Sequence, residues 1–139
     1  MVGADIEPVF HLENQAPSPW GRALIEDELN HDQSIVLVAI VAGEVVGWCC
    51  CRYIQDEAEL LKIGVAESWR RRSVAALMLA ALEEELQTVG ALSLYLEVRS
   101  ENLPAVSFYR QAGFTATGRR INYYSQPRDD AVVLRKSIM

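Results

Sequence analysis

The sequence predicts one α/β domain, residues 1–139, in which helices are layered on a mixed, mostly antiparallel sheet of about six strands. Three observations lead to this fold class. Short segments rich in Val, Ile and Leu alternate between apolar and polar positions, which is typical of strands. Four other segments have apolar residues three and four positions apart, which is typical of helices. Along the chain the order is helix, helix, three strands, helix, strand, helix, two strands.

Length and composition agree with a globular domain. The 139 residues are 50% hydrophobic and 23% charged, and a chain of this length forms a core without disulfides or metals. No apolar run approaches the roughly 20 residues that a membrane-spanning helix needs. Residues 1–10 also lack the basic and then apolar layout of a secretion signal. We therefore expect a cytoplasmic protein with no membrane partner.

The chain is acidic, with 13 basic and 19 acidic residues and a formal charge of −6. Because nucleic-acid-binding proteins usually have the opposite balance, we expect no direct binding to nucleic acid. An acidic surface favours a cationic partner such as an amine or a basic peptide. Solubility alone explains the charge equally well.

Three consecutive cysteines, Cys49, Cys50 and Cys51, lie in an apolar stretch. In a strand their side chains alternate between the two faces, so Cys50 points away from the other two. This geometry suits neither a compact metal site nor a disulfide framework. We interpret them as buried or half-buried strand residues in a reducing compartment, and we predict no metal site.

The N-terminal part of the chain is predicted to form two helices. Residues 5–15 have apolar positions at near-helical spacing, and residues 20–29 repeat the pattern. Pro17 and Pro19 interrupt it, which predicts a bend over residues 16–20.

The middle of the chain is predicted to form three strands that follow one another. Residues 34–41 and 45–53 are rich in apolar residues and flank a short turn, which indicates a hairpin. Residues 58–65 form the third strand after a polar turn. Its apolar residues on one face are Leu61, Ile63 and Val65.

The second half of the chain alternates helices and strands. A long apolar stripe predicts a helix over residues 71–89. A strand over 92–98 and a helix over 102–112 follow. Residues 114–124 and 130–138 are predicted to close the sheet as an antiparallel pair.

Three arginines followed by small side chains connect the third strand to the long helix. A helix N-terminus has unpaired N–H groups and a partial positive charge. Together with nearby guanidinium groups it suits a di- or triphosphorylated ligand. The alternative is a solvated basic turn, but such a concentration of arginine in an acidic chain favours phosphate binding. The predicted site comprises Arg70, Arg71, Arg72, Ser73, Val74, Ala75 and Ala76.

This turn and several later motifs together resemble the GNAT N-acetyltransferase superfamily. Residues 70–75 are similar to the family's acetyl-CoA motif, Gln/Arg-x-x-Gly-x-Gly/Ala, with Ser73 in place of the first glycine. The resemblance extends from about Ile6 to Leu134. The segments that resemble the family's second half are Leu94–Arg99 followed by Asn102, Ala105–Tyr109 and Ala112–Phe114.

Other motifs are similar, more narrowly, to the bacterial ribosomal-protein alanine N-acetyltransferases. These motifs are Arg119–Tyr124 followed by Asp129–Ala131, and the Pro19–Trp20 pair. The resemblance implies the GNAT fold, a twisted sheet with helices on both faces. Members of the family usually open with a strand, whereas this chain starts almost at the first helix. Either that edge strand is missing or residues 1–4 supply a stub of it.

The resemblance also implies that acetyl-CoA is the co-substrate. The backbone groups of Ile63, Gly64 and Val65 would then contact the pantetheine arm, and residues 70–76 would hold the pyrophosphate. Asn102 either contacts CoA or caps its helix, and the two roles are compatible.

Two residues match the general base and the general acid of the family. Glu97 lies near the end of a strand, opposite a row of leucine and valine side chains, and by resemblance takes the proton of the amine. Tyr109 shares a helix face with Asn102 and by resemblance protonates the departing CoA sulfur. The alternatives are an ordinary rim carboxylate and a core tyrosine. The implied transfer is direct, without an acyl-enzyme.

By resemblance the acceptor is a protein N-terminal α-amino group, such as that of a ribosomal protein. Trp20, Tyr123 and Tyr124 are candidates for the peptide groove, and the acidic residues would attract a basic N-terminus. Two alternatives stay open. One is a GNAT acetyltransferase of a small amine, a polyamine or a lysine side chain, and the other is a CoA-binding module without catalysis.

Overall fold

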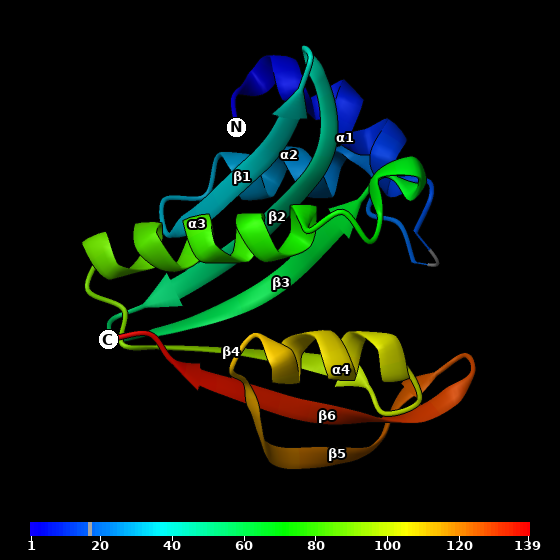
Figure 1. Ribbon diagram of the computed structural model, residues 1–139, viewed down its shortest axis with the longest axis vertical. Coiled ribbons are helices and arrows are strands. Elements are labelled where there is room, and N and C mark those ends of the chain that lie inside the picture. Colours follow the sequence, from blue (N-terminus) through cyan, green and yellow to red (C-terminus); the bar gives the residue numbers. More distant parts are fainter. Residues whose placement is uncertain (17) are drawn as a thin grey trace.

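The computed structural model describes residues 1–16 and 18–139, which form a six-stranded sheet with helices on both faces (Figure 1). The spatial strand order is β1-β2-β3-β4-β6-β5. The β3–β4 pair is parallel and the other neighbouring pairs are antiparallel. This confirms the predicted mixed, mostly antiparallel sheet. The strands are β1 Ser34–Val41, β2 Glu44–Ile54, β3 Glu57–Val65, β4 Ser93–Arg99, β5 Thr115–Ser125 and β6 Arg128–Ser137.

The helices lie in two layers. α1 and α2 pack on one face of the sheet, and α3 and α4 pack on the other (Figure 1). None of the helices in the described part of the chain is long and apolar enough to cross a membrane. The helices are α1 Ile6–Glu13, α2 Arg22–Leu29, α3 Val74–Thr88 and α4 Leu103–Gln111.

The N-terminal residues do not form the stub of an edge strand, so that alternative is wrong. Gly3–Asp5 forms a 3₁₀ turn because the Asp5 carboxylate accepts a hydrogen bond from Val2 N at 2.8 Å. Among the described residues up to 33 no strand is present, and β1 is the edge of the sheet. The predicted bend near residue 17 includes Pro17, which lies outside the described residues.

The long helix begins three residues later than predicted. Arg71 and Ser73 have φ angles of +63° and +64°, in the left-handed region. A residue in this conformation cannot continue a right-handed helix, so α3 starts at Val74 with Ser73 as its N-cap residue. The second helix likewise begins at Arg22, because Gly21 has an extended backbone.

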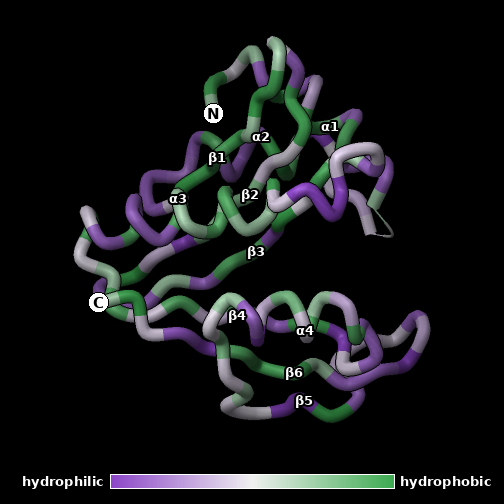
Figure 2. Tube along the Cα trace, in the orientation of Figure 1, coloured by the Kyte–Doolittle hydropathy of each residue, from purple (hydrophilic) through white to green (hydrophobic). Residues whose placement is uncertain are grey.

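The sheet separates two hydrophobic cores, and the cysteines confirm the predicted alternation. Cys49 and Cys51 belong to the core under α3 and α4, whereas Cys50 belongs to the core under α1 and α2. Burial raises the pKa of the Cys49 thiol to about 12. The thiols are therefore protonated packing groups rather than nucleophiles. Figure 2 shows hydrophobic residues concentrated along the strands, with a hydrophilic turn leading into α3.

β3 changes direction at Leu61, and this contradicts the predicted face. The β2–β3 register skips Leu61, which indicates a β-bulge. As a result Leu61 packs in the α1/α2 core, whereas Ile63 and Val65 pack against the opposite core. Strict alternation of side chains does not allow for the extra residue of a bulge, so it placed Leu61, Ile63 and Val65 on one face.

The bulge lies where the sheet opens. β3 pairs with β4 at Glu57–Ser93, Ala58–Leu94 and Glu59–Tyr95. Beyond Glu59 the two strands diverge, and the sheet forms a V between them (Figure 1). Bulges bend a strand and increase its local twist, so the bulge at Leu61 helps to turn β3 away from β4.

Candidate active site

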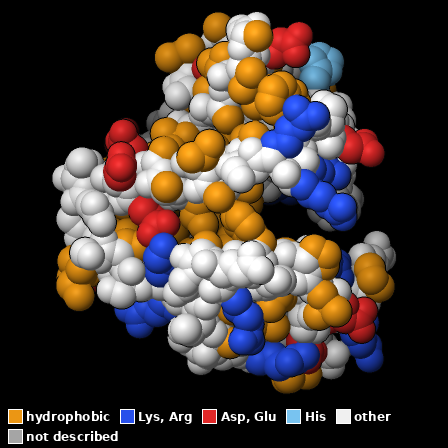
Figure 3. All heavy atoms as spheres, in the orientation of Figure 1, with side chains coloured by type: hydrophobic (Ala, Val, Ile, Leu, Met, Phe, Trp, Pro, Cys, Tyr) orange, Lys and Arg blue, Asp and Glu red, His pale blue; other side chains and the backbone are white. Residues whose placement is uncertain are grey.

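A cavity of about 670 Å³ fills the V between the diverging strands. The space-filling view shows the molecule hollowed between its two halves (Figure 3). β3 supplies one wall, residues 60–65, and β4 supplies the other, residues 96–99. Because the strands no longer pair there, backbone groups on their facing edges are available to an extended ligand.

A second cavity of about 430 Å³ lies at the N-terminus of α3. It shares Val65, Arg70, Ala75 and Phe108 with the first cavity, so the two are adjoining parts of one site. The first-turn N–H groups of a helix have no intrahelical partner and favour an anion. This end of the site is therefore suited to phosphate groups.

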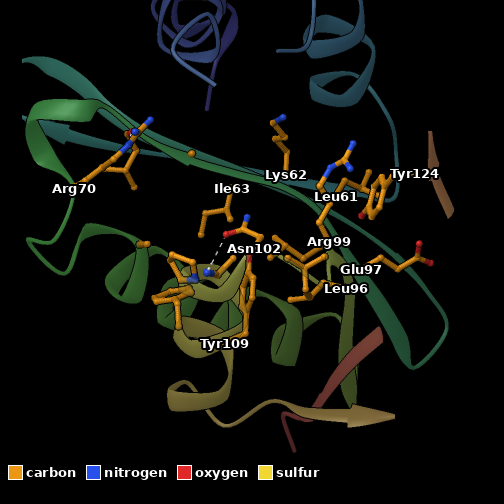
Figure 4. Close-up of a pocket in the computed structure, with 18 residues that line it drawn as sticks. Leu61, Lys62, Ile63, Arg70, Leu96, Glu97, Arg99, Asn102, Tyr109 and Tyr124 are labelled. Atoms are coloured by element: carbon orange, nitrogen blue, oxygen red, sulfur yellow. Dashed lines mark hydrogen bonds between the residues drawn. The ribbon is translucent and has the colours of Figure 1, made fainter. Parts of the chain in front are cut away.

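The turn before α3 brings its arginines to different places. Arg70 lines both cavities, and its Nε donates a hydrogen bond to the carbonyl of Val65 at 3.1 Å (Figure 4). Arg71 lines the second cavity. Arg72 instead stacks over Trp69, with its guanidinium carbon Cζ 5.2 Å from the centre of the ring. The left-handed backbone of Ser73 explains why glycine is common at this position of the motif, since glycine adopts that conformation without strain.

Glu97 projects from β4, and its side chain is 13% exposed. Its Oε1 lies 3.1 Å from Arg120 Nε, an ion pair that joins β4 to β5 across β6. The negative charge of Glu97 also affects a second carboxylate, Glu59 on β3. Burial, and secondly the charge of Glu97, raise the pKa of the Glu59 carboxyl above its ordinary range. Glu97 is thus a carboxylate with a fixed orientation at the cavity wall.

Tyr109 lies on α4 with 7% of its surface exposed. Its ring packs against Phe108 and Phe114 with centroid distances of 5.1 and 5.5 Å. Burial raises the pKa of Tyr109 well above its ordinary value, so the hydroxyl keeps its proton at neutral pH. A protonated hydroxyl that borders the cavity can act as a proton donor.

Asn102 caps α4, as predicted: its Oδ1 accepts a hydrogen bond from Ala105 N at 3.3 Å (Figure 4). It borders the same cavity as Glu97 and Tyr109. Contact between Asn102 and a cofactor remains a prediction.

The structure brings most of the predicted site residues together. The first cavity is bordered by Ile63, Gly64, Val65, Arg70, Ala75, Glu97, Asn102, Tyr109 and Tyr124. The second is bordered by Val65, Arg70, Arg71, Ser73, Val74, Ala75 and Ala76. Within the described ranges, Arg72, Trp20 and Tyr123 border neither cavity. Trp20 packs on Trp48 with ring centroids 5.7 Å apart, and Tyr123 packs edge-on against Tyr124 at 5.1 Å.

Sequence reasoning missed Lys62, Arg99 and Phe108, which all line the first cavity. Lys62 was detectable as a single charge inside an apolar strand. Arg99 follows Glu97 by two residues and hence shares its face of the strand. Its guanidinium donates to the Pro127 carbonyl at 2.7 Å and lies 4.3 Å from the centre of the Tyr124 ring.

Comparisons with known proteins agree with this geometry. The model of the acetyltransferase (GNAT) family matches residues 6–114. The ribosomal protein bS18 alanine N-acetyltransferase of Salmonella typhimurium is 28% identical over 134 residues, which cover 94% of this chain and 89% of that protein.

Two solved structures are similar over nearly the whole chain. The crystal structure of the ribosomal-protein-S18-alanine N-acetyltransferase from Escherichia coli has a TM-score of 0.91 at 26% identity, covering 99% of this chain and 90% of that one. The structure of Ard1 from Thermoplasma volcanium has a TM-score of 0.91 at 30% identity, covering 100% and 95%. With its splayed sheet, its carboxylate and tyrosine at one cavity, and the family match over residues 6–114, this chain belongs to the GNAT family of N-acetyltransferases.

Proposed function

We propose that this enzyme transfers the acetyl group of acetyl-CoA to the N-terminal α-amino group of a protein, of the ribosomal-protein alanine type. The observation that carries the proposal is that Glu97 and Tyr109 border one cavity, which adjoins the N-terminus of α3. One end of the site thus suits the phosphates of the donor. The other end has a base and an acid.

The donor would lie along β3. Ile63, Gly64 and Val65 offer backbone groups to the amides of the pantetheine arm, because β3 has left its parallel partner there. The N–H groups of Val74 and Ala75 and the Arg70 guanidinium would receive the pyrophosphate. Enzymes of this family use acetyl-CoA.

The chemistry needs one base and one acid. A free α-amine has a pKa of about 7.7–8.0, so removing its proton near neutral pH is a modest task for the Glu97 carboxylate. The amine nitrogen then attacks the thioester carbonyl carbon, and the C–S bond breaks as the tetrahedral intermediate collapses. The Tyr109 hydroxyl gives its proton to the departing thiolate, and the second proton that the attacking nitrogen must lose restores the tyrosine, while Glu97 releases its proton to water. The products are an N-acetylated peptide and CoA.

A protein N-terminus is favoured as acceptor on three grounds. The similar enzymes from Salmonella typhimurium and Escherichia coli are named for this acceptor. Tyr124 adds an aromatic surface to the cavity, held there by Arg99. The formal charge of −6 favours a basic partner.

The test is a competition between amines. The protein is incubated with acetyl-CoA and a basic peptide that begins with alanine, such as the N-terminal segment of ribosomal protein bS18, and the products are sequenced by mass spectrometry. We expect one acetyl group, on the α-nitrogen. The matched control is the same peptide with a blocked α-amine and its lysine side chains free, which should remain unmodified.

Two results would contradict the proposal in different ways. Acetylation of the blocked peptide, or of a free polyamine in preference to the open peptide, would assign the enzyme to small amines or lysine side chains. Tight binding of acetyl-CoA without transfer to any of these amines would indicate a CoA-binding module.

A further inference from the structure

Two leucines, one from each diverging strand, lie at the narrow end of the cavity. The β3–β4 pairing ends at Glu59 and Tyr95. Leu60 and Leu96 are the next residues along the two strands, so they lie where the strands begin to separate. Both border the cavity, although they are only 7% and 2% exposed. These two apolar side chains form what we call the end wall of the cavity.

The end wall lies on the same face of the sheet as the proposed acid. Leu60, Leu96 and Tyr109 all belong to the hydrophobic core under α3 and α4. Glu97 follows Leu96 directly, and because side chains alternate along a strand, it points to the opposite face. A thioester held between the strands would therefore meet the amine from the Glu97 side. Its sulfur and its acyl group would lie on the side of Tyr109 and the end wall.

The phosphate end of the site determines where the acyl group lies. Figure 4 shows Arg70 at one side of the site, Tyr109 in the middle and Leu96 beyond it. Residues 65 to 63 of β3 lead along the cavity in the same direction. A donor that is anchored by its phosphates at the N-terminus of α3 would thus reach Tyr109 with its sulfur and the end wall with its acyl group. Because the anchor is fixed, each carbon added to the acyl group must be placed against Leu60 and Leu96.

The end wall is backed by closely packed side chains. The strand pair behind it joins Ala58 to Leu94, which are 1% and 0% exposed and belong to the same core. Protein cores are packed as densely as organic crystals, and an extra methylene forces side chains out of their preferred rotamers. Leu60 and Leu96 therefore cannot withdraw from a longer acyl chain without strain.

We propose that Leu60 and Leu96 restrict the donor to acetyl-CoA by excluding longer acyl groups from the narrow end of the cavity. The inference rests on the proposed function, because it takes the donor to bind with its phosphates at α3 and its thioester beside Tyr109. It adds the residues that select the acyl group, a choice that neither the acid nor the base makes. One methylene more or less in an apolar pocket changes the preference between two substrates by about 10–200-fold.

The first experiment needs no acceptor. Free CoA, acetyl-CoA, propionyl-CoA and butyryl-CoA are titrated calorimetrically into the wild type and into Leu96→Ala. We expect the wild type to bind acetyl-CoA at least about tenfold more tightly than butyryl-CoA. In Leu96→Ala, which shortens one side of the end wall, the two dissociation constants should agree within about twofold. Free CoA has no acyl group, so it should bind equally to both proteins.

Leu86→Ala is the matched control. Leu86 is 0% exposed and belongs to the same core as Leu96, but it lies near the C-terminal end of α3 and borders neither cavity. The two substitutions remove the same atoms from one core. Leu86→Ala should keep the wild-type preference for acetyl-CoA. Equal loss of this preference in the two variants, or equal affinity of the wild type for acetyl-CoA and butyryl-CoA, would overturn the proposal.

Smaller substitutions decide the question if Leu96→Ala does not fold. Leu60→Val and Leu96→Val each shorten the end wall by one methylene and disturb the core less than alanine does. Each should reduce the preference for acetyl-CoA over propionyl-CoA, by up to about tenfold. An unchanged preference in both valine variants would refute the role of the two leucines.

A competition assay extends the test to transfer. The basic alanine peptide is incubated with equal concentrations of acetyl-CoA and butyryl-CoA, and mass spectrometry identifies the acyl group attached. The wild type and Leu86→Ala should attach acetyl groups, whereas Leu96→Ala should attach both. If the wild type modifies no peptide, the proposed function fails, and the dissociation constants still decide whether the leucines select the acyl group. If the wild type transfers acetyl and butyryl groups equally well, the proposed function stands and this inference is wrong.

Discussion

Glu97 and Arg120 form an ion pair that spans three strands, with Oε1 and Nε 3.1 Å apart. The pair fixes the proposed base on β4 to the outer strand β5. We expect Glu97→Gln to lower kcat/KM for the peptide by about 10²–10³ at pH 7, the usual contribution of a positioned general base. The defect should shrink above pH 8, because the free α-amine then becomes abundant without enzymatic help.

The control for this prediction is Glu59→Gln. Glu59 is the neighbouring carboxylate on β3 whose pKa Glu97 affects, but it does not line the cavity. Its loss should reduce kcat/KM less than about tenfold, below the range expected for a general base. Steady-state rates of the two variants would be measured from pH 6 to pH 9.5. If Glu97→Gln lowers kcat/KM no more than Glu59→Gln over this range, Glu97 is not the general base.

Tyr109→Phe should slow turnover by about 10² or more while leaving CoA affinity nearly intact, since it removes one hydroxyl from a well-packed ring. Burial raises the pKa of Tyr109, so its proton is retained throughout the usual assay range and deprotonation of this residue should not limit the rate below pH 10. Single-turnover kinetics and calorimetric CoA titration measure the two quantities. Tyr95→Phe is the control, because Tyr95 lies on β4 outside the cavity.

Ser73→Gly should stabilise the protein, because Ser73 has a φ of +64° and the left-handed conformation costs a non-glycine residue about 1 kcal/mol. Thermal unfolding should shift upward by about 4 °C. Acetyl-CoA affinity should stay equal or improve, because the backbone N–H is kept and a Cβ is removed beside the second cavity.

Ala75→Gly provides the opposite case. Ala75 lies in the first turn of α3 with helical backbone, where glycine costs about 0.5–1 kcal/mol. A lower melting temperature is expected for this variant. If Ser73→Gly and Ala75→Gly both raise the melting temperature, or if neither does, the inference that the backbone of Ser73 is strained is wrong.

Acid should loosen the contact between the start of β6 and the turn that follows β4. The Asp129 carboxylate accepts hydrogen bonds from the Ser100 hydroxyl and from Glu101 N, and these hold its pKa below the ordinary value, the Ser100 bond most of all. The folded state thus favours the ionised form. The resulting stability is present above the ordinary carboxyl pKa and is lost as pH falls through the lowered folded value.

Asp129→Asn should therefore melt below the wild type at pH 7, and the difference should vanish toward pH 2–3, where the wild-type carboxyl is protonated too. Melting curves at a series of pH values test this. A constant difference across the whole range would show that Asp129 acts by packing rather than by charge.

The order of elements could be predicted from the sequence because each depends on local periodicity. The alternation in β4 survives in the fold. The apolar stripe that predicted α3 is only partly buried: Met78, Leu82 and Leu86 pack in the core, whereas Leu77 is exposed. The capping role of Asn102 was also readable, since a cap and its helix lie within one turn of chain. Glu97 and Tyr109 were named from the family resemblance, and both border one cavity, but their catalytic roles stay predictions.

What could not be predicted depends on contacts between distant segments. The bulge at Leu61 reverses one side chain relative to the alternation rule, and the left-handed Ser73 shortens α3. Glu13 looks like an ordinary helix-end carboxylate in the sequence, but it is fully buried, hydrogen-bonded to Trp48 and ion-paired with Lys62. These partners are 35 and 49 positions away, and no local pattern connects them.

The divergence of β3 from β4 beyond Glu59 has a consequence for the order of events in the catalytic cycle. Among the described strand pairs, β3 and β4 are hydrogen-bonded only at the closed end of the V, so the backbone groups on their facing edges are unpaired beyond that point. A donor whose amides form hydrogen bonds with residues 63–65 would take the place of a paired strand at this edge of β3. Binding of the donor would then order β3 beside the place where the acceptor is proposed to bind, and this predicts that acetyl-CoA binds before the peptide.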